Sequence, residues 1–237
     1  MRGRLITVEG IDGVGKTTHT ARLVNYLTQL GFQVATYREP GGTPLGEQLR
    51  LLIKAGSAQS ALSELLLFAA ARAELVTTRI RPDMQQGVFV VLDRFTDSTW
   101  SYQGALDDIP EEALNAVCAA AADKLAPDLT LWLDLSPEEA YRRRYPLAGE
   151  MAAGEIDPAT QPSELDAIER RDVGYFQRVR ARYLSLAQAE PQRIARIDAS
   201  GTLEQTATMI RARLDERLKQ WVAAGKGARR SGTEGNR

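Results

Sequence analysis

A glycine-rich stretch followed by a lysine and two threonines holds the residues whose types and spacing most directly indicate chemistry. Residues 10–18 read GIDGVGKTT and fit the pattern G-x-x-x-x-G-K-[ST]. Glycines let the backbone approach phosphate oxygens closely, and N–H groups at a helix N-terminus point toward an anion. In such a loop Lys16 reaches the β- and γ-phosphates of a nucleotide, and the Thr17 hydroxyl binds Mg²⁺. The residues expected to bind the phosphates are Gly10, Ile11, Asp12, Gly13, Val14, Gly15, Lys16, Thr17 and Thr18.

The segments on either side of this loop support a phosphate site. Residues 5–9 form an apolar, β-branched run that is typical of a buried strand. After the loop, apolar residues recur at helical spacing from Leu23 to Leu30, and Gly31 is a typical helix C-cap. A strand, a glycine loop and a helix are the context in which the pattern binds phosphate. An ordinary glycine turn between a strand and a helix is the alternative.

Charged residues follow two further strand patterns. The strand expected at 34–37 ends at Arg38, before Pro-Gly-Gly forces a loop, and the strand at 88–92 ends at Asp93 and Arg94. Ligands of open α/β sheets bind at the carboxyl ends of the strands, so both arginines are placed to meet an anion. Asp93 fits the aspartate that accompanies Mg²⁺ near a phosphate loop. On position alone, Arg38 also fits a solvated loop arginine.

Aromatic and polar side chains supply a candidate second binding surface. Phe68 and Arg72 lie four residues apart in a long helical pattern, so they share one helix face. Together they suit a nucleobase, by stacking and hydrogen bonding, but a core phenylalanine beside a surface arginine fits the same spacing. Residues 95–103 are rich in polar and aromatic groups. They suit either a substrate wall or a helix start capped by Asp97 or Ser98.

Strand and helix patterns alternate along the chain. Further strands are expected at 129–135 and 193–197, and an amphipathic helix is expected from 203 to about 222. The alternation predicts an α/β fold, a five-stranded parallel sheet with helices on both faces. One domain is expected over 1–224, followed by a disordered tail at 225–237 that is rich in Gly, Lys, Arg and Ser.

An irregular segment interrupts this alternation. Proline and glycine residues mark 146–163, which is too long for a tight connection, and such loops are usually lids or disordered. An arginine triplet at 142–144 precedes the segment, and Arg170 follows it. Arginines on both sides of a mobile segment would close over a transferred phosphate, so a lid is expected at about 142–171. A solvated, charged hinge is the alternative.

The composition excludes several classes of function. The 30 basic and 31 acidic side chains nearly balance, which gives no overall attraction to nucleic acid or to an anionic membrane. Cys118 is the only cysteine, so an internal disulfide is excluded and a reducing compartment is favoured. His19 is the only histidine, which excludes histidine-based triads and multi-histidine metal sites. No signal peptide or membrane-spanning run is expected, so the chain is interpreted as a cytoplasmic enzyme.

Taken together, the motifs resemble those of bacterial thymidylate kinases, a family of P-loop nucleoside monophosphate kinases. The resemblance rests on EGIDGVGKTT from Glu9, REPGGT from Arg38, FAAAR from Phe68, DRF from Asp93 with Ser98, Tyr102 and Gln103, and RARYL from Arg180. It covers nearly the whole chain. Many NTPases share the phosphate loop, whereas REPGGT combined with the Asp-Arg-aromatic block is much more specific. The resemblance implies a P-loop kinase fold with a small lid, transfer of the γ-phosphoryl group of ATP to dTMP, a Mg²⁺ cofactor and a homodimer.

The resemblance also implies which residues bind the nucleoside of dTMP. Phe68 stacks on the thymine, and Arg72 contacts its edge. Thr99 and Gln103 lie along the base or the sugar. Tyr102 sits where a ribose 2′-hydroxyl would be, which favours deoxy substrates.

The phosphates and the adenine have their own implied partners. Arg38 and Arg94 bind the phosphate of dTMP. Asp12 holds the deoxyribose 3′-hydroxyl or positions the acceptor phosphate through Arg38. The segment that begins with Asp198 and Ala199 lies beside the adenine of ATP. Mg²⁺ is expected at Thr17 and Asp93, and no nucleic acid or membrane partner is expected.

One catalytic arginine comes from either the phosphate loop or the lid in this family. Gly13 stands at the loop position and supplies no charge, so the chain resembles the lid-arginine type. The lid motif departs from the family pattern, because Ala167 stands where an arginine is expected. The residues expected to complete the catalytic group of Lys16, Asp12 and Arg94 are Arg142, Arg143, Arg144 or Arg170.

Two rival functions share many of these features. Another nucleoside monophosphate kinase, acting on dUMP or a purine, is weakly disfavoured by Phe68, Arg72 and Tyr102. A P-loop switch or motor that hydrolyses ATP needs a positioned water and effector loops. Here Arg38, Arg72 and Arg94 are an excess of cations that suits a second anionic substrate instead.

Overall fold

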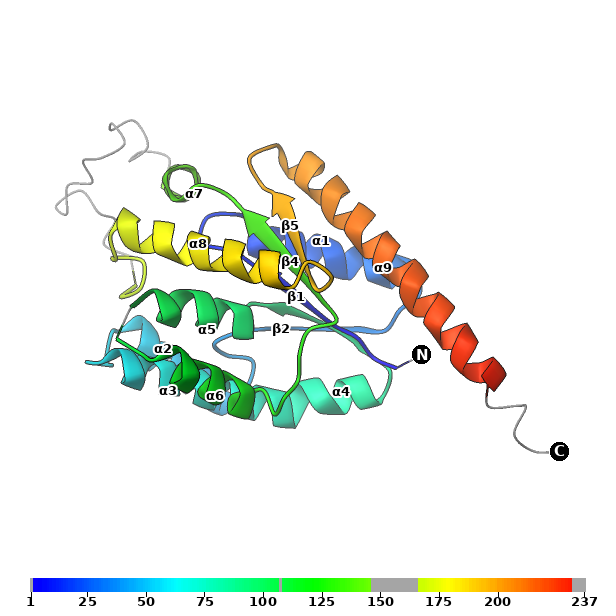
Figure 1. The fold of residues 1–237 in the computed structure, drawn as a ribbon, viewed down its shortest axis with the longest axis horizontal. Coiled ribbons are helices and arrows are strands. Elements are labelled where there is room, and N and C mark those ends of the chain that lie inside the picture. The colour runs from blue at the N-terminus through cyan, green and yellow to red at the C-terminus, as the bar shows by residue number, and fades with distance from the viewer. Residues whose placement is uncertain (1, 107, 146–165, 232–237) are drawn as a thin grey trace.

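Five parallel strands form one sheet in the order β2-β3-β1-β4-β5 (Figure 1). The structure, a computed structural model, describes residues 2–106, 108–145 and 166–231, with side chains as far as Ala223. The strands are β1 (Leu5–Glu9), β2 (Val34–Arg38), β3 (Phe89–Asp93), β4 (Leu129–Asp134) and β5 (Ile194–Asp198). The predicted α/β fold with a five-stranded parallel sheet is therefore confirmed.

Helices connect the strands and cover both faces of the sheet. They are α1 (Lys16–Gln29), α2 (Pro44–Lys54), α3 (Ala61–Leu75), η1 (Val76–Ile80), α4 (Arg81–Gln85), α5 (Thr96–Tyr102), η2 (Gln103–Leu106), α6 (Glu111–Ala121), α7 (Pro137–Arg144), α8 (Val173–Ala189) and α9 (Leu203–Ser231). The long helical pattern before β3 is realised as α2, α3 and α4, with one turn of π-helix, η1, between α3 and α4.

Side chains of β1 pack into two core clusters. Ile6 and Val8 belong to the cluster that contains Leu23 and Leu27 of α1 and also includes side chains of α8 and α9. Leu5 points the other way, into a second cluster that includes η1 and the end of α3. In Figure 1, α1 and α9 lie on one side of the sheet and α5 and α8 on the other. A central strand that is buried on both faces explains why residues 5–9 read as a continuous apolar run.

The register of the strands aligns their carboxyl ends. Val8 and Arg38 both lie opposite Asp93, and Asp134 lies opposite Asp198. The phosphate loop after β1, the REPGGT loop after β2 and the Asp-Arg pair after β3 therefore meet at one edge of the sheet. This is the edge at which open α/β sheets bind their ligands.

Two local predictions are corrected by the structure. Helix α5 begins at Thr96, without a capping side chain, so Asp97 and Ser98 are not N-caps. Both are buried inside the helix, where they contact other elements. The backbone of α9 is helical as far as Ser231, well past the predicted end near residue 222. Alanine, lysine and arginine are good helix formers, which favours a helix that continues past residue 222. The disordered tail at 225–237 stays a prediction.

Two expectations concern residues that the structure does not describe. The whole irregular segment at 146–163 and the last six residues of the tail, 232–237, lie outside the described ranges. Within those ranges, no helix is both long enough and apolar enough to cross a membrane.

Candidate active site

Glycines shape the loop between β1 and α1. Gly13 and Gly15 have φ values of 87° and 90°, in the left-handed region that glycine adopts most readily. A Cβ atom on Gly13 would overlap the carbonyl oxygen of Ala140 in α7, so no side chain fits at this position. Lys16 folds back over the loop, and its Nζ donates to the carbonyl oxygen of Ile11 at 2.8 Å. The ammonium group thus lies at the N-terminus of α1, where anions are favoured.

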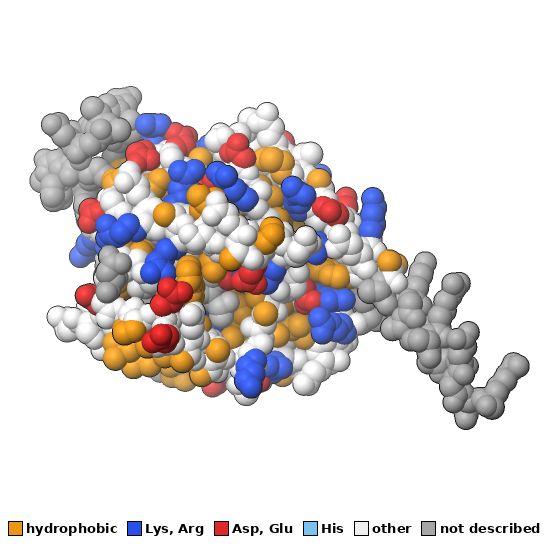
Figure 2. Space-filling model, in the orientation of Figure 1, with side chains coloured by type: hydrophobic (Ala, Val, Ile, Leu, Met, Phe, Trp, Pro, Cys, Tyr) orange, Lys and Arg blue, Asp and Glu red, His pale blue; other side chains and the backbone are white. Residues whose placement is uncertain are grey.

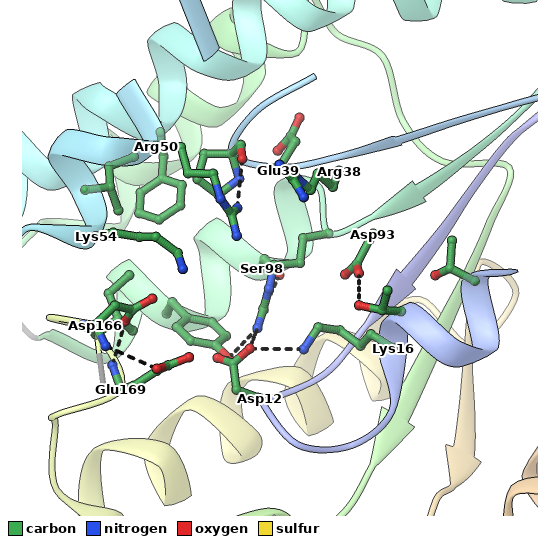
Figure 3. A pocket seen from close by; sticks show the side chains of 18 of the residues that line it. Asp12, Lys16, Arg38, Glu39, Arg50, Lys54, Asp93, Ser98, Asp166 and Glu169 are labelled. Atoms are coloured by element: carbon green, nitrogen blue, oxygen red, sulfur yellow. Dashed lines mark hydrogen bonds and ion pairs between the residues drawn. The ribbon is translucent and has the colours of Figure 1, made fainter. Parts of the chain in front are cut away.

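A hydroxyl and a carboxylate form a small oxygen cluster beside the loop. Thr17 Oγ1 donates to Asp93 Oδ2 at 3.0 Å (Figure 3). Mg²⁺ prefers oxygen ligands and is usually held by one or two protein groups together with substrate phosphates and water. The Thr17–Asp93 pair fits that mode of binding. The described residues contain no group of three His, Cys, Asp or Glu side chains that would hold a metal ion by itself.

Arg94 is held in an unusual conformation in the middle of the cleft. Its φ of 74° is left-handed, and its backbone N–H donates to the carbonyl oxygen of Val8 at 3.1 Å. Nη2 donates to Asp12 Oδ1 at 2.7 Å and to the Tyr102 hydroxyl at 3.0 Å. Nη1 donates to Ser98 Oγ at 3.0 Å. A sparsely populated backbone conformation that so many contacts maintain is typical of functional sites.

Asp12 joins two cations of the cleft. Besides contacting Arg94, its Oδ1 lies 3.4 Å from Lys16 Nζ (Figure 3). Burial alone would raise the pKa of Asp12, but the charges of Arg94 and Lys16 outweigh it and hold that pKa well below its usual range. Burial lowers the pKa of Lys16, and Arg94 lowers it further against the attraction of Asp12. Asp12 is therefore an ionised carboxylate that holds a guanidinium and an ammonium group close together.

A buried carboxyl group lies behind Arg94. Glu9 accepts hydrogen bonds from one backbone N–H at 2.7 Å, from Ser98 Oγ at 2.5 Å and from the Tyr183 hydroxyl at 2.9 Å. Burial and the nearby charge of Asp97 raise the pKa of Glu9 to about 7. Because Ser98 contacts both Glu9 and Arg94, this buried network helps to fix the position of the Arg94 guanidinium group.

A buried ion pair forms another part of the wall. Arg72 on α3 donates through Nε and Nη2 to Glu39 Oε2 at 2.9 and 2.7 Å, and through Nη2 to Thr99 Oγ1 at 2.7 Å. The two side chains are only 1% and 3% exposed. Burial raises the pKa of Glu39 more than Arg72 lowers it. Arg72 Nη1 has no protein acceptor among the described residues, and a buried donor of this kind suits an acceptor atom of a ligand.

One cleft of about 750 Å³ connects these groups, except Glu9 and Tyr183, which are buried behind its wall. The predicted site residues that line it, apart from the arginines near the lid, are Asp12, Gly13, Gly15, Lys16, Thr17, Thr18, Arg38, Phe68, Arg72, Asp93, Arg94, Thr99, Tyr102 and Gln103. Every residue expected to bind dTMP is therefore on the wall of the cleft. Gly10, Ile11 and Val14 are buried and are not part of the wall. Asp198 and Ala199 also lie off the wall, although the Ala199 carbonyl oxygen accepts from Arg143 Nη1 at 2.7 Å.

The arginines near the expected lid fall into two groups. Arg143 and Arg144 line the cleft, and Arg144 forms an ion pair with Glu169 and lies 3.9 Å from Asp12. Arg142 is 52% exposed and pairs with Glu139 on its own helix. Arg170 is exposed and is not part of the cleft wall. The structure therefore brings Arg143 and Arg144 to the site and leaves Arg142 and Arg170 outside it.

Several residues of the cleft wall were not predicted from the sequence. Arg50 and Lys54 of α2, and Asp166 and Glu169 after the undescribed segment, face the cleft in Figure 3. Arg50 and Lys54 are four residues apart on a helix that starts directly after the REPGGT loop. That spacing could have indicated their role, because it places both cations on one face of a helix that begins near Arg38.

Comparison with known proteins gives one consistent result. The family model for thymidylate kinase matches residues 8–210. The thymidylate kinase of Chlorobium chlorochromatii is 44% identical over 220 residues, which cover 92% of this chain and 97% of that protein. That of Symbiobacterium thermophilum is 42% identical over 90% of this chain and 93% of that protein. The crystal structure of thymidylate kinase from Ehrlichia chaffeensis superimposes with a TM-score of 0.70 at 28% identity, covering 91% of this chain and 99% of that one. With a match this long and this similar, the chain belongs to the thymidylate kinase family.

Proposed function

We propose that this chain is an ATP-dependent dTMP kinase, which transfers the γ-phosphoryl group of ATP to dTMP and produces ADP and dTDP for dTTP synthesis. One observation carries the proposal. The cleft that contains a phosphate loop also contains a second group of cations, Arg38, Arg72 and Arg94. A nucleotide hydrolase needs only the first group, whereas a kinase with a phosphorylated acceptor needs both.

The donor nucleotide binds at the phosphate loop. Backbone N–H groups at the start of α1 and the Lys16 ammonium group contact the phosphates of ATP. Mg²⁺, held at Thr17 and Asp93, would neutralise charge on the β- and γ-phosphates. The segment from Asp198 through Ala199 lies beside the adenine.

The acceptor binds beside the second group of cations. Phe68 stacks on the thymine, and the free Nη1 of Arg72 donates to the base edge. Thr99 and Gln103 complete the pocket of the base. Tyr102, whose hydroxyl contacts Arg94, fills the space that a 2′-hydroxyl would need.

The phosphate of dTMP is already an anionic nucleophile, so no strong general base is required. The work of the protein is alignment and charge neutralisation. Arg38 and Arg94 hold the acceptor phosphate, while Asp12 keeps Arg94 and Lys16 close together. Closing the cleft over both nucleotides excludes water, so that ATP is not hydrolysed.

The remaining catalytic arginine comes from the end of α7. Arg143 and Arg144 line the cleft, and the clash that any side chain on Gly13 would make with Ala140 leaves the loop without an arginine at that position. Arg142→Ala is a matched control on the same helix. Replacing Arg143 or Arg144 by alanine should lower kcat much more than the control does. Equal effects of all three changes would contradict this role.

The activity is tested by measuring ADP formation with ATP-Mg²⁺ and a panel of nucleoside monophosphates. We expect little ADP without an acceptor and a steep rise with dTMP. Turnover of a different monophosphate would keep the phosphate roles and refute the assignment of the base site. ADP formation that does not depend on any acceptor would instead identify an NTPase.

A homodimer also belongs to this proposal. Figure 2 shows hydrophobic side chains gathered along the lower edge of the molecule, over α2, α3 and α6. The exposed leucines of α2 and α3 are Leu45, Leu51, Leu52, Leu62 and Leu66. A contiguous apolar face of this kind usually marks an interface, and a second copy of the chain is its proposed occupant.

Light scattering after gel filtration tests the dimer. Leu51 is 68% exposed, and Leu51→Glu should shift the protein to the monomer mass. Leu203→Glu is the control, because Leu203 on α9 is 50% exposed but lies outside the patch. A wild-type monomer would refute the proposal. The cytoplasmic location, the single domain over 1–224 and the lid at about 142–171 remain predictions.

A further inference from the structure

Gln103 is attached to a charged network that lies behind the cleft. It follows α5, is 1% exposed and lines the cleft near Phe68 and Arg72. Its Nε2 donates to Glu64 Oε1 on α3 at 2.8 Å. Glu64 is not part of the cleft wall, so it touches Gln103 from the side that faces away from the ligand space.

The chemistry of this contact sets the direction of the Gln103 amide. A carboxylate accepts hydrogen bonds and donates none, so only the NH₂ end of the amide can face Glu64. The carbonyl oxygen must then occupy the other end. Among the described residues it accepts no hydrogen bond, which leaves it available to a ligand.

Glu64 is itself held in place by a second ionic contact. Arg171 Nη2 pairs with Glu64 Oε2 at 2.5 Å, and Arg171 Nη1 donates to the Tyr175 hydroxyl at 2.6 Å. The guanidinium group lies 4.7 Å from the centre of the Tyr175 ring. Glu64 and Arg171 are 14% and 22% exposed. The aromatic contact limits the movement of Arg171, so the ion pair holds the Glu64 side chain in place.

We propose that Glu64 is a positioning residue that selects the base, because it holds the Gln103 amide with its carbonyl oxygen toward the nucleobase. Arg72 contacts Thr99, which lies four residues before Gln103, so Arg72 would present a donor and Gln103 an acceptor to the same base. This pair matches the O4 acceptor and N3–H donor of a thymine- or uracil-type base. It opposes cytosine, which has an amino group at position 4 and an unprotonated N3. The inference rests on the base site of the proposed function.

The test compares the binding of dUMP and dCMP, which differ only at positions 3 and 4 of the base. Dissociation constants are measured by calorimetry on the full-length protein without ATP. Wild type should bind dUMP more tightly than dCMP. In Glu64→Gln the partner of Gln103 can donate as well as accept, so the amide is free to turn. The preference for dUMP should fall by roughly tenfold, the worth of one hydrogen bond.

Two further variants separate positioning from a general loss of structure. Gln103→Glu places two carboxylates against each other and should weaken the binding of both ligands. In the double variant Glu64→Gln with Gln103→Glu, the amide of residue 64 donates to the carboxylate at 103, which keeps an acceptor toward N3–H. The preference for dUMP should return. Glu112→Gln, an exposed change on the neighbouring α6, should leave the preference unaltered.

The outcomes distinguish this inference from the proposed function. If wild type does not prefer dUMP over dCMP, the proposed base site fails. If wild type shows the preference and Glu64→Gln retains it in full, the base site stands and the role of Glu64 is refuted. If Glu64→Gln does not fold, the double variant is used in its place. A double variant that folds but does not prefer dUMP over dCMP also refutes the positioning role of Glu64.

Discussion

Replacing Glu39 by glutamine tests whether the buried ion pair with Arg72 holds the wall of the cleft together. The substitution keeps the size of the side chain and removes its charge. Arg72 would keep one neutral acceptor in place of a carboxylate that takes two charge-assisted hydrogen bonds at 2.9 and 2.7 Å. With side chains only 1% and 3% exposed, water cannot replace the lost partner.

The expected loss is large for a single substitution. Breaking a buried ion pair from one side costs about 3–5 kcal/mol, because the remaining charge stays buried without compensation. The amide oxygen of glutamine still accepts a hydrogen bond, which places the expected value near the lower end, at about 3 kcal/mol. A domain of this size has a free energy of unfolding of roughly 5–15 kcal/mol, so the variant should still fold.

Urea unfolding of the two proteins measures this loss, and Glu216→Gln on α9 is the matched control. Glu216 pairs with Arg213, but both side chains are 58% exposed, so its loss should cost no more than roughly 0.5 kcal/mol. The variant should also bind dTMP less well, since the Arg72 side chain is held toward the cleft less firmly. If Glu39→Gln costs no more than the control, the reasoning about burial is wrong.

Three further predictions use other parts of the site. Lys16→Met should lower kcat by about 10²–10³-fold in the ADP assay, because it removes a charge that the transition state needs. Gly13→Ala should lower Tm more than Gly31→Ala does. Both glycines have φ near +87°, but only at Gly13 would a Cβ atom meet other atoms. If the two variants have a similar Tm, the clash with α7 is excluded. Folded Glu9 has a pKa raised from 4.5 to about 7, so the stability that its proton provides is complete below pH 4.5 and is lost as the pH rises to 7. The unfolding free energy of wild type relative to Glu9→Gln should therefore fall over this range by about 3 kcal/mol in denaturant titrations, and a difference that does not vary with pH would contradict the burial of a titrating group.

The sheet and the phosphate loop were predictable from local patterns. Each strand is a short apolar run bounded by glycine, proline or charged residues, so its position follows from nearest neighbours in the sequence. Once five strands alternate with helices, parallel alignment brings their carboxyl ends together. Arg38, Asp93 and Arg94 therefore meet the phosphate loop without further information.

The partners of these residues were not predictable in the same way. Glu39 and Arg72 are 33 residues apart, and Glu64 and Gln103 are 39 apart. No periodicity connects such pairs, because the tertiary fold alone decides which helix face reaches which loop. The choice among the lid arginines has the same cause. Consecutive residues of a helix point in different directions, so the arginine triplet at 142–144 of α7 does not itself indicate which side chains reach the site. Only the position of α7 in the fold shows that Arg143 and Arg144 line the cleft.

The arrangement of charge explains how a chain with a net charge of -1 can bind two polyanionic nucleotides. Arg94 is held by Asp12, Arg72 by Glu39, Arg38 by Glu47 and Arg144 by Glu169. Each carboxylate keeps its cation oriented toward the cleft, and Glu39 also avoids the cost of leaving the buried Arg72 unpaired. The pairs differ in burial, and this difference separates their roles. Arg38 is 57% exposed and can exchange Glu47 for a phosphate at little cost, whereas the buried Arg72–Glu39 pair stays intact and offers only its free Nη1. In the proposed function, phosphate binding would therefore exchange partners at the rim, while base recognition would add a contact to a pair that does not open.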